Sequence, residues 1–222
     1  MKAGVLVFPG SNCDRDLADS FQSFGASVQL IWHKESSLPS GLDIIGVPGG
    51  FSFGDYLRCG AIAANSPICR SLITFGESGG YILGICNGFQ ILTETGLLPG
   101  ALIQNNGLKF LGKTVDLKVE TPDSVFTYRY KKNQLIAVPI AHHEGNYTVA
   151  EDDLAALRDQ DRVAFSYCKN PNGSVDDIAG ILSSNRRILG MMPHPERAVD
   201  ALTGVPDCQP FFAGLAAGLL SD

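Results

Sequence analysis

The chain alternates short apolar runs with amphipathic segments, and this alternation limits its fold more than any other feature. Apolar runs expected to form buried β-strands span Ala3 to Phe8, Val28 to Trp32, Asp43 to Val47 and Tyr81 to Ile85. Between the first two runs, Asp14 to Phe24 carries apolar residues at helical spacing. Strands that are joined through helices usually pair in parallel. We therefore expect an α/β fold with an open, mostly parallel sheet flanked by helices.

The second half of the chain predicts a different strand arrangement. Leu108 to Glu120, Val125 to Tyr130 and Gln134 to Ala141 are strand-like runs with little helical periodicity between them. We therefore expect some antiparallel strands in the middle of the chain. No repeat, linker or low-complexity segment divides the sequence, which predicts one domain over residues 1–222. The remaining expected elements are a helix at Glu151 to Arg158, strands at Val163 to Tyr167, Ile178 to Leu182 and Ile188 to Met191, and a closing helix at Pro210 to Leu220.

The charge balance excludes several classes of partner. The 222 residues contain 17 Lys and Arg against 23 Asp and Glu, a formal net charge of −6 with a pI near 5.2, whereas nucleic-acid-binding domains are basic. No apolar run approaches the roughly 20 residues that span a bilayer, and the N-terminal apolar stretch is too short for a signal peptide. Six cysteines without a CxxC pair favour neither a disulfide scaffold nor a zinc site. We expect a cytoplasmic protein that binds neither nucleic acid nor membranes.

One expected strand runs through a single cysteine directly into a helix. The segment Tyr81 to Leu92 reads YILGICNGFQIL, and Cys86 stands at its tight strand-to-helix turn. Gly84 and Gly88 flank the cysteine, where such a turn brings backbones too close for a Cβ atom. The helix N-terminus favours the thiolate of Cys86, and the amide of Asn87 can donate to a developing oxyanion. Most buried cysteines only fill the core, but this setting predicts a nucleophile.

A proton shuttle for this cysteine is predicted at the end of another strand. Of the four histidines, His194 follows an apolar run, and Pro193 and Pro195 keep its backbone extended. Glu196, two residues on, can hydrogen-bond Nδ1 of the imidazole and fix its tautomer. Cys86, His194 and Glu196 therefore predict a triad of nucleophile, base and orienting carboxylate.

A glycine-rich loop follows a third strand. The segment Val47 to Asp55 reads VPGGFSFGD and lacks the GK[ST] of a phosphate-binding loop. Such a loop is often only a turn, but the amides of Gly49, Gly50 or Phe51 can complement the helix amide in an oxyanion hole.

The run AHHEG at residues 141–145 resembles a metal site only superficially. His142 and His143 are adjacent, so on a strand they point to opposite faces, and no third ligand follows at useful spacing. We therefore expect no metal in this chain.

Together these segments resemble the class I, or triad-type, glutamine amidotransferases. GICNGFQ at Gly84 to Gln90 matches the G-x-C-x-G-x-Q elbow of that family, and PHPE at Pro193 to Glu196 matches its second signature. The resemblance spans the chain and implies a flavodoxin-like α/β fold. Within the family, the chain is most similar to glutaminase subunits that serve purine biosynthesis, through FPGSNCDRD (8–16), PGGFSFGDYLRCGAIA (48–63), GICNGFQILTETGLLPGAL (84–102), PIAHHEGNY (139–147), NPNGS (170–174) and GMMPHPERA (190–198).

The resemblance implies a role for each candidate residue. Cys86 would attack the side-chain amide of glutamine to form a γ-glutamyl thioester. His194 would protonate the departing ammonia and then activate water, while Glu196 keeps the imidazole aligned. The family usually has glycine in place of His143, so backbone contacts at this position are expected to differ. The residues expected to bind glutamine or its oxyanion are Gly49, Gly50, Phe51, Asn87, Gln90, His142, His143 and Glu144.

The resemblance also implies a multi-subunit enzyme. The sequence has no ATP-binding loop, so ATP and Mg²⁺ are expected on a large synthetase subunit, joined by a small bridging subunit. This partner would use channelled ammonia to convert formylglycinamide ribonucleotide to formylglycinamidine ribonucleotide. No cofactor is expected in this chain.

Three alternatives stay open at the level of sequence. The chain could serve as the glutaminase subunit of another synthase, act as an independent γ-glutamyl cysteine hydrolase, or be a non-catalytic subunit. The segments FPGSNCDRD and NPNGS favour the purine enzyme over another synthase. The complete set of Cys86, His194 and Glu196 counts against a non-catalytic role.

Overall fold

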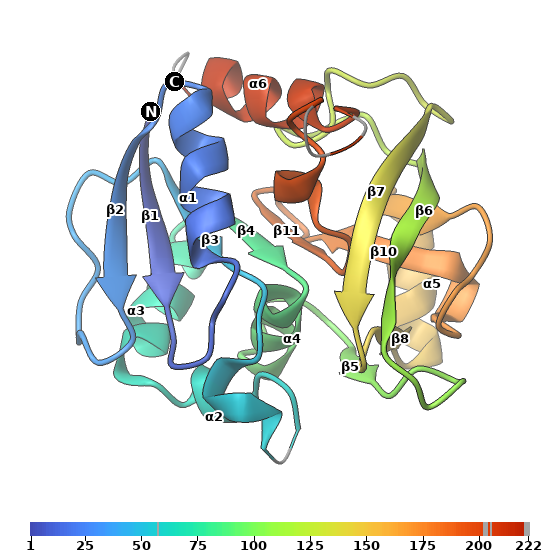
Figure 1. The fold of residues 1–222 in the computed structure, drawn as a ribbon, viewed down its shortest axis with the longest axis horizontal. Helices are drawn as coiled ribbons and strands as arrows, with labels where there is room; N and C mark the ends of the chain where they lie inside the picture. Colours follow the sequence, from blue (N-terminus) through green and yellow to red (C-terminus); the bar gives the residue numbers. More distant parts are fainter. Residues whose placement is uncertain (57, 202–203, 205, 220–222) are drawn as a thin grey trace.

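A mixed β-sheet organises the molecule (Figure 1). The computed structural model describes residues 1–56, 58–201, 204 and 206–219. Within these residues, the sheet has the strand order β2-β1-β3-β4-β11-β10-β9-β6-β7, and β5 and β8 form a separate two-stranded sheet. The expected combination of parallel and antiparallel strands is confirmed. The antiparallel share is larger than expected, because β9 and β10 also pair in this way.

The parallel half of the sheet joins the N-terminal strands to one C-terminal strand. β1 pairs with β2 and β3, and β4 pairs with β3 and β11, all in parallel. The central strands β3, β4 and β11 are almost completely buried, as expected where helices cover both faces of a parallel sheet. The bounds are β1 (Lys2–Val7), β2 (Ser27–Trp32), β3 (Ile44–Val47), β4 (Tyr81–Ile85) and β11 (Ile188–Met191).

The antiparallel half continues the sheet from β11. β10 pairs with β11 and β9, and β6 pairs with β9 and β7. Along β7, every second residue is buried, so one face of this strand packs on the core. The bounds are β6 (Leu111–Val119), β7 (Leu135–His142), β9 (Val163–Tyr167), β10 (Ile178–Leu182), and β5 (Ala101–Ile103) with β8 (Asn146–Thr148) in the small sheet.

Helices flank the parallel strands. A Cβ atom built on Gly46 of β3 would lie 2.7 Å from Leu17 and 3.0 Å from Phe21 of α1, so this helix packs closely on the sheet. Gly76 of α3 approaches Ile82 of β4 in a similar way. Among the described residues, no helix is long and apolar enough to cross a membrane. The bounds are α1 (Asp14–Ser23), α2 (Ala61–Ala64), α3 (Pro67–Glu77), α4 (Asn87–Glu94), α5 (Glu151–Asp159) and α6 (Gln209–Gly218).

The prediction of a strand at Val125 to Tyr130 is wrong. These residues form turns that pack against α6. The ring centroid of Phe126 lies 6.1 Å from that of Phe211, and the hydroxyl of Tyr128 donates to the carbonyl of Gly214 at 3.2 Å. The apolar residues in this run therefore face a helix, and a short apolar run does not reveal by itself which surface it covers.

The sequence analysis did not identify α2, α3, β5 and β8. The helix α3 follows Ser66 and begins at Pro67, which is a common first helical residue. The strands β5 and β8 have three residues each, too few for a periodic pattern. The expected C-terminal helix is present as α6, and its expected last residue, Leu220, lies outside the described residues.

The contact between α4 and β3 yields a stability prediction. A Cβ atom built on Gly88 would lie 1.9 Å from the carbonyl oxygen of Val47, and two backbones cannot yield as a flexible side chain can. We expect Gly88→Ala to lower the free energy of unfolding by about 3 kcal/mol, as overpacked cores do. Gly107→Ala is the control, because nothing lies within 4 Å of its added Cβ, and it should change stability by less than about 0.5 kcal/mol. Equal urea midpoints for the two variants would contradict the prediction.

Candidate active site

Cys86 occupies a strained strand-to-helix turn of the predicted kind. Its backbone has φ 51° and ψ −106°, and it directly precedes α4. Left-handed backbone at a non-glycine residue costs of order 1–3 kcal/mol and persists where the surroundings enforce it. Here, the amide of Cys86 donates to the carbonyl of Met191 at 2.8 Å. A Cβ atom on Gly84 would lie 2.9 Å from the carbonyl oxygen of Gly88, so both flanking glycines are required by close backbone contact.

His194 and Glu196 form a buried pair beyond the end of β11. The Nδ1 atom of His194 lies 2.6 Å from Oε1 of Glu196, and both side chains are almost completely buried. The short 3-10 turn Pro195–Arg197 brings the carboxylate back to the ring. The amide of His194 donates to the carbonyl of Pro139 at 2.8 Å, which fixes the segment against β7. The ring is therefore held in one orientation with Nδ1 towards the carboxylate.

The charge state of His194 depends on its neighbours. Burial disfavours the charged ring, but the negative charge of Glu196 and the thiol group of Cys86 outweigh burial and hold the pKa of His194 well above its usual value. Within the described part of the chain, Nε2 of His194 is buried and has no hydrogen-bond partner. That nitrogen is therefore available to exchange a proton with a reacting group.

Gly49 lies between the nucleophile and the histidine. A Cβ atom built on Gly49 would lie 2.7 Å from Cε1 of His194 and 3.3 Å from Cβ of Cys86. Any side chain at this position would separate or displace the two catalytic candidates. Gly49, Cys86 and His194 thus follow the C-terminal ends of β3, β4 and β11 and meet at one edge of the sheet.

A small cavity borders Cys86 and contains most of the residues predicted to bind substrate. Its volume of about 20 Å³ exceeds the space of one water molecule only slightly, so glutamine can enter only if the lining moves. Gly49 and Asn87 lie beside this cavity and do not line it. The lining residues are Gly50, Phe51, Asp55, Cys59, Cys86, Gln90, Ala141, His142, His143 and Glu144.

Asn87 and Gln90 use their side chains to connect α4 to the cavity wall. The Nδ2 atom of Asn87 donates to Oε1 of Gln90 at 2.8 Å, and Nε2 of Gln90 donates to the carbonyl of Glu144 at 2.6 Å. The backbone N–H of Asn87 lies in the first turn of α4, where the helix supplies no acceptor. Gln90 therefore shapes the pocket, and the backbone of Asn87 is placed to serve an oxyanion.

The two adjacent histidines have different environments. His142 is buried, and its Nδ1 lies 3.1 Å from Oδ1 of Asn105. Burial and the charge of His194 lower the pKa of His142 to about 4, so its ring is neutral at pH 7. His143 is exposed and lines the outer part of the cavity.

The glycine-rich loop is held by its own hydrogen bonds. The amide of Phe51 donates to the carbonyl of Gly10 at 3.1 Å, so this amide is occupied in the present conformation. The side chain of Phe51 is 43% exposed and lines the cavity instead. Gly50 has φ +136° and abuts Asn12, whereas Gly49 lies against His194 and Cys86.

Asp55 and Cys59 also line the pocket and were not predicted from the sequence. Burial raises the pKa of Asp55; the Cys59 thiol opposes the shift and the negative charge of Glu144 adds to it. The amide of Cys59 donates to Oε2 of Glu144 at 3.4 Å, and burial together with the two carboxyl groups raises the pKa of the Cys59 thiol. Phe53, Gly54 and Asp55 all have positive φ, which marks a strained turn. An acidic residue inside a glycine-rich loop after a strand was the available signal.

Comparisons with known proteins show the family of this chain. Residues 1–206 match the CobB/CobQ-like glutamine amidotransferase domain. The chain is 64% identical to "Phosphoribosylformylglycinamidine synthase subunit PurQ" of Roseobacter denitrificans, over 99% of both chains, and 65% identical to the protein of the same name from Ruegeria sp. (strain TM1040), over 82% of both. Among solved structures, a chain from "Structure of PurLQS from Thermotoga maritima" superimposes with a TM-score of 0.91 at 43% identity, covering 98% of both chains. The chain therefore belongs to the CobB/CobQ-like glutamine amidotransferases and, within them, to the PurQ subunits of phosphoribosylformylglycinamidine synthase.

Proposed function

We propose that this chain hydrolyses glutamine to glutamate and ammonia through a covalent intermediate on Cys86. The observation that carries the proposal is the buried His194–Glu196 pair next to a cysteine at a strained strand-to-helix turn. A nucleophile, a base and an orienting carboxylate in this relation suit acyl transfer from an amide. The name of the matching family, glutamine amidotransferase, describes transfer of the amide nitrogen of glutamine.

The proton transfers follow from the geometry of His194. The Cys86 thiolate attacks the side-chain amide carbon, and the oxyanion accepts hydrogen bonds from the amides of Asn87 and of Gly49 or Gly50. The imidazolium of His194 gives its Nε2 proton to the leaving nitrogen, which departs as ammonia and leaves a γ-glutamyl thioester. His194 then takes a proton from water, and the hydroxide releases glutamate and restores the thiolate. Throughout, Glu196 stabilises the charged ring and holds its orientation.

The two carboxyl groups of the pocket provide a site for the α-ammonium group of glutamine. Asp55 and Glu144 line the same cavity as Cys59, and the two carboxyl groups repel each other in the absence of a cation. A bound ammonium group would relieve this repulsion and donate hydrogen bonds to both carboxylates. His143, exposed at the outer part of the cavity, is placed to contact the α-carboxylate. In this assignment, glutamine is bound by the glycine-rich loop, through Asp55, as well as by the 142–144 segment.

We place the ammonia acceptor on another subunit. The PurQ relatives are named as subunits of phosphoribosylformylglycinamidine synthase, and the similar solved structure is named as a PurLQS assembly. These names support a large synthetase subunit and a small bridging subunit as partners. ATP, Mg²⁺ and formylglycinamide ribonucleotide would bind to the synthetase. A cytoplasmic location fits six cysteines that are all free thiols.

Partner dependence separates this proposal from its alternatives. Glutamate release from glutamine should be slow for the purified chain and strongly stimulated by the synthetase subunit, the small subunit, ATP and formylglycinamide ribonucleotide. Equal rates alone and in the mixture would instead indicate an independent γ-glutamyl hydrolase. Stimulation by the synthetase subunit of a different synthase, without stimulation by the purine synthetase, would indicate that the chain is the glutaminase subunit of that other synthase.

The nucleophile assignment predicts the effect of one substitution. Cys86→Ala should lower glutamate release in the complex by about 10⁴-fold or more, because loss of a covalent nucleophile removes the whole acyl-enzyme route. Cys168→Ala is the matched control, since Cys168 is exposed and has no part in the proposed mechanism. Glutamate release that survives in Cys86→Ala would rule out the thioester mechanism.

The His194–Glu196 pair predicts a pH-dependent stability. Because the folded pKa of His194 is raised, the pair contributes stability that is fully present below the unfolded pKa and is lost as pH rises through the folded pKa. Glu196→Gln removes the charge that raises this pKa. The loss of unfolding free energy in Glu196→Gln should therefore be larger at pH 6 than at pH 9.5, as measured by urea denaturation. An equal loss at both values would show that the pair is not charged in the folded protein.

The same variant, Glu196→Gln, should also lower kcat for glutamate release by about 10²–10⁴-fold.

The ammonium site predicts a selective loss of substrate binding. Asp55→Asn should raise KM for glutamine by about tenfold or more, because a charge-assisted hydrogen bond contributes about 1.5–3 kcal/mol. The substrate 4-carbamoylbutanoate lacks the α-amine, so it should react equally well with the wild type and with Asp55→Asn. A similar loss with both substrates would mean that Asp55 acts on the fold of the loop rather than on the amine.

A further inference from the structure

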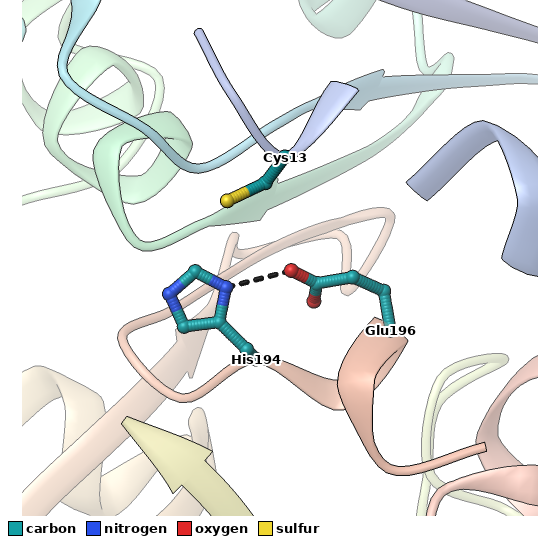
Figure 2. Close-up of side chains that lie close together, drawn as sticks. All are labelled: Cys13, His194 and Glu196. Atoms are coloured by element: carbon teal, nitrogen blue, oxygen red, sulfur yellow. Dashed lines mark hydrogen bonds and ion pairs between the residues drawn. The ribbon is translucent and has the colours of Figure 1, made fainter. Parts of the chain in front are cut away.

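A second cysteine lies against the catalytic pair (Figure 2). Cys13 directly precedes α1 and is only 3% exposed. One ligand atom each from Cys13, His194 and Glu196 lie within 4.8 Å of one another. The three residues come from two distant parts of the chain, and the glutaminase mechanism uses only two of them. Cys13 therefore needs a separate explanation.

The three side chains form the donor set of a transition-metal site. A thiolate, an imidazole nitrogen and a carboxylate oxygen are the usual protein ligands of Zn²⁺. Glu196 supports this interpretation independently, because its second oxygen, Oε2, is buried without a hydrogen-bond partner in the described part of the chain. Buried carboxylate oxygens are rarely left unpaired, and a cation would satisfy this one.

We propose that Cys13, His194 and Glu196 bind one divalent transition-metal ion of the Zn²⁺ type, and that this ion reversibly inhibits the enzyme. Nδ1 of His194 already faces Glu196, so it is the ring nitrogen that can share an ion with this carboxylate. On binding, the Cys13 thiol proton and the proton between Nδ1 and Glu196 pass to solvent, and the ion takes their place. The coordinated ring can no longer be held by Glu196 as the mechanism requires.

The surroundings allow an ion to enter. A cavity of about 150 Å³ is lined by two of the three proposed ligands, Cys13 and His194. It is lined on its outer side by Phe51 and Phe110, which are 43% and 50% exposed. A cavity of this size can also hold a water molecule, which would complete a tetrahedral coordination sphere around three protein ligands.

The nearby arginine leaves the charge of the site balanced. Nη2 of Arg197 donates to Sγ of Cys13 at 3.1 Å, and the same group forms an ion pair with Asp16 at 2.9 Å. Arg197 and Asp16 neutralise each other, and the two negative ligands, Cys13 and Glu196, match the charge of a divalent cation. The hydrogen bond from Arg197 can persist to a metal-bound thiolate, in which it would stabilise the ligand from outside the coordination sphere.

Metal binding can be tested without any turnover. Cobalt(II) replaces zinc in such sites and gives a thiolate-to-cobalt charge-transfer absorption. We expect the wild type and Cys86→Ser to show this absorption at one equivalent of Co²⁺, and Cys13→Ser to lose it. Absorption that disappears in Cys86→Ser and persists in Cys13→Ser would place the ion on the nucleophile and overturn the proposal. Absence of the absorption in the wild type would also overturn it.

Inhibition provides the second readout and rests on the proposed glutaminase activity. The concentration of Zn²⁺ that halves glutamate release, measured relative to each protein's own rate, should rise by about tenfold or more in Cys13→Ser, because losing a ligand should cost at least as much as losing an outer partner. Cys168→Ser should behave as the wild type, and a chelator should restore activity. Equal zinc sensitivity of Cys13→Ser and wild type would contradict the inhibitory role. Cobalt binding without any glutaminase activity would contradict the proposed function and leave the metal site intact.

Discussion

The register of three parallel strands is the constraint on which the site depends. β4 pairs with β3 so that Gly84 lies opposite Val47, and it pairs with β11 so that Gly84 also lies opposite Gly190. The chain therefore leaves all three strands at the same level and the same edge. A slip of one residue in either pairing would move one partner by about 3.3 Å and turn its side chains to the other face. Gly49, Cys86 and His194 thus lie close together because β4 pairs with both β3 and β11 in this register.

This arrangement concentrates charge where water is excluded. His194 and Glu196 are both buried, and neither would be charged there without the other. In the neighbouring His142, burial and the charge of His194 lower the pKa to about 4. Its Nδ1 contacts Asn105, so no carboxylate opposes this shift. Two buried histidines in one site therefore carry different charges, and the difference depends on the group that each Nδ1 contacts.

The sequence predicted the features that depend on local chemistry. The strands at residues 163–167, 178–182 and 188–191 were predicted with the observed bounds, because each is a short apolar run between turn residues. The turn at Cys86 was predicted because only glycine fits on either side of it. Features that depend on the packing of distant segments were missed: the run at 125–130 packs on α6, and Asp55 reaches the pocket through three successive left-handed residues. The roles in substrate binding stay predictions, since a closed cavity shows which residues are near and not which of them hold glutamine.

The proposed metal site follows from the same features that make the triad a good catalyst. A base that must keep one orientation needs a carboxylate at its other ring nitrogen, and that carboxylate must be buried to act strongly. A buried carboxylate with one unpaired oxygen is also a good ligand, and a thiol beside it completes a site for a borderline cation. Replacing Cys13 by a residue without a donor atom would remove the proposed metal site, but it would also remove a thiol that helps to raise the pKa of His194. Cys13 is therefore placed to act on this active site in two ways, through the charge of His194 and as a ligand of the proposed ion.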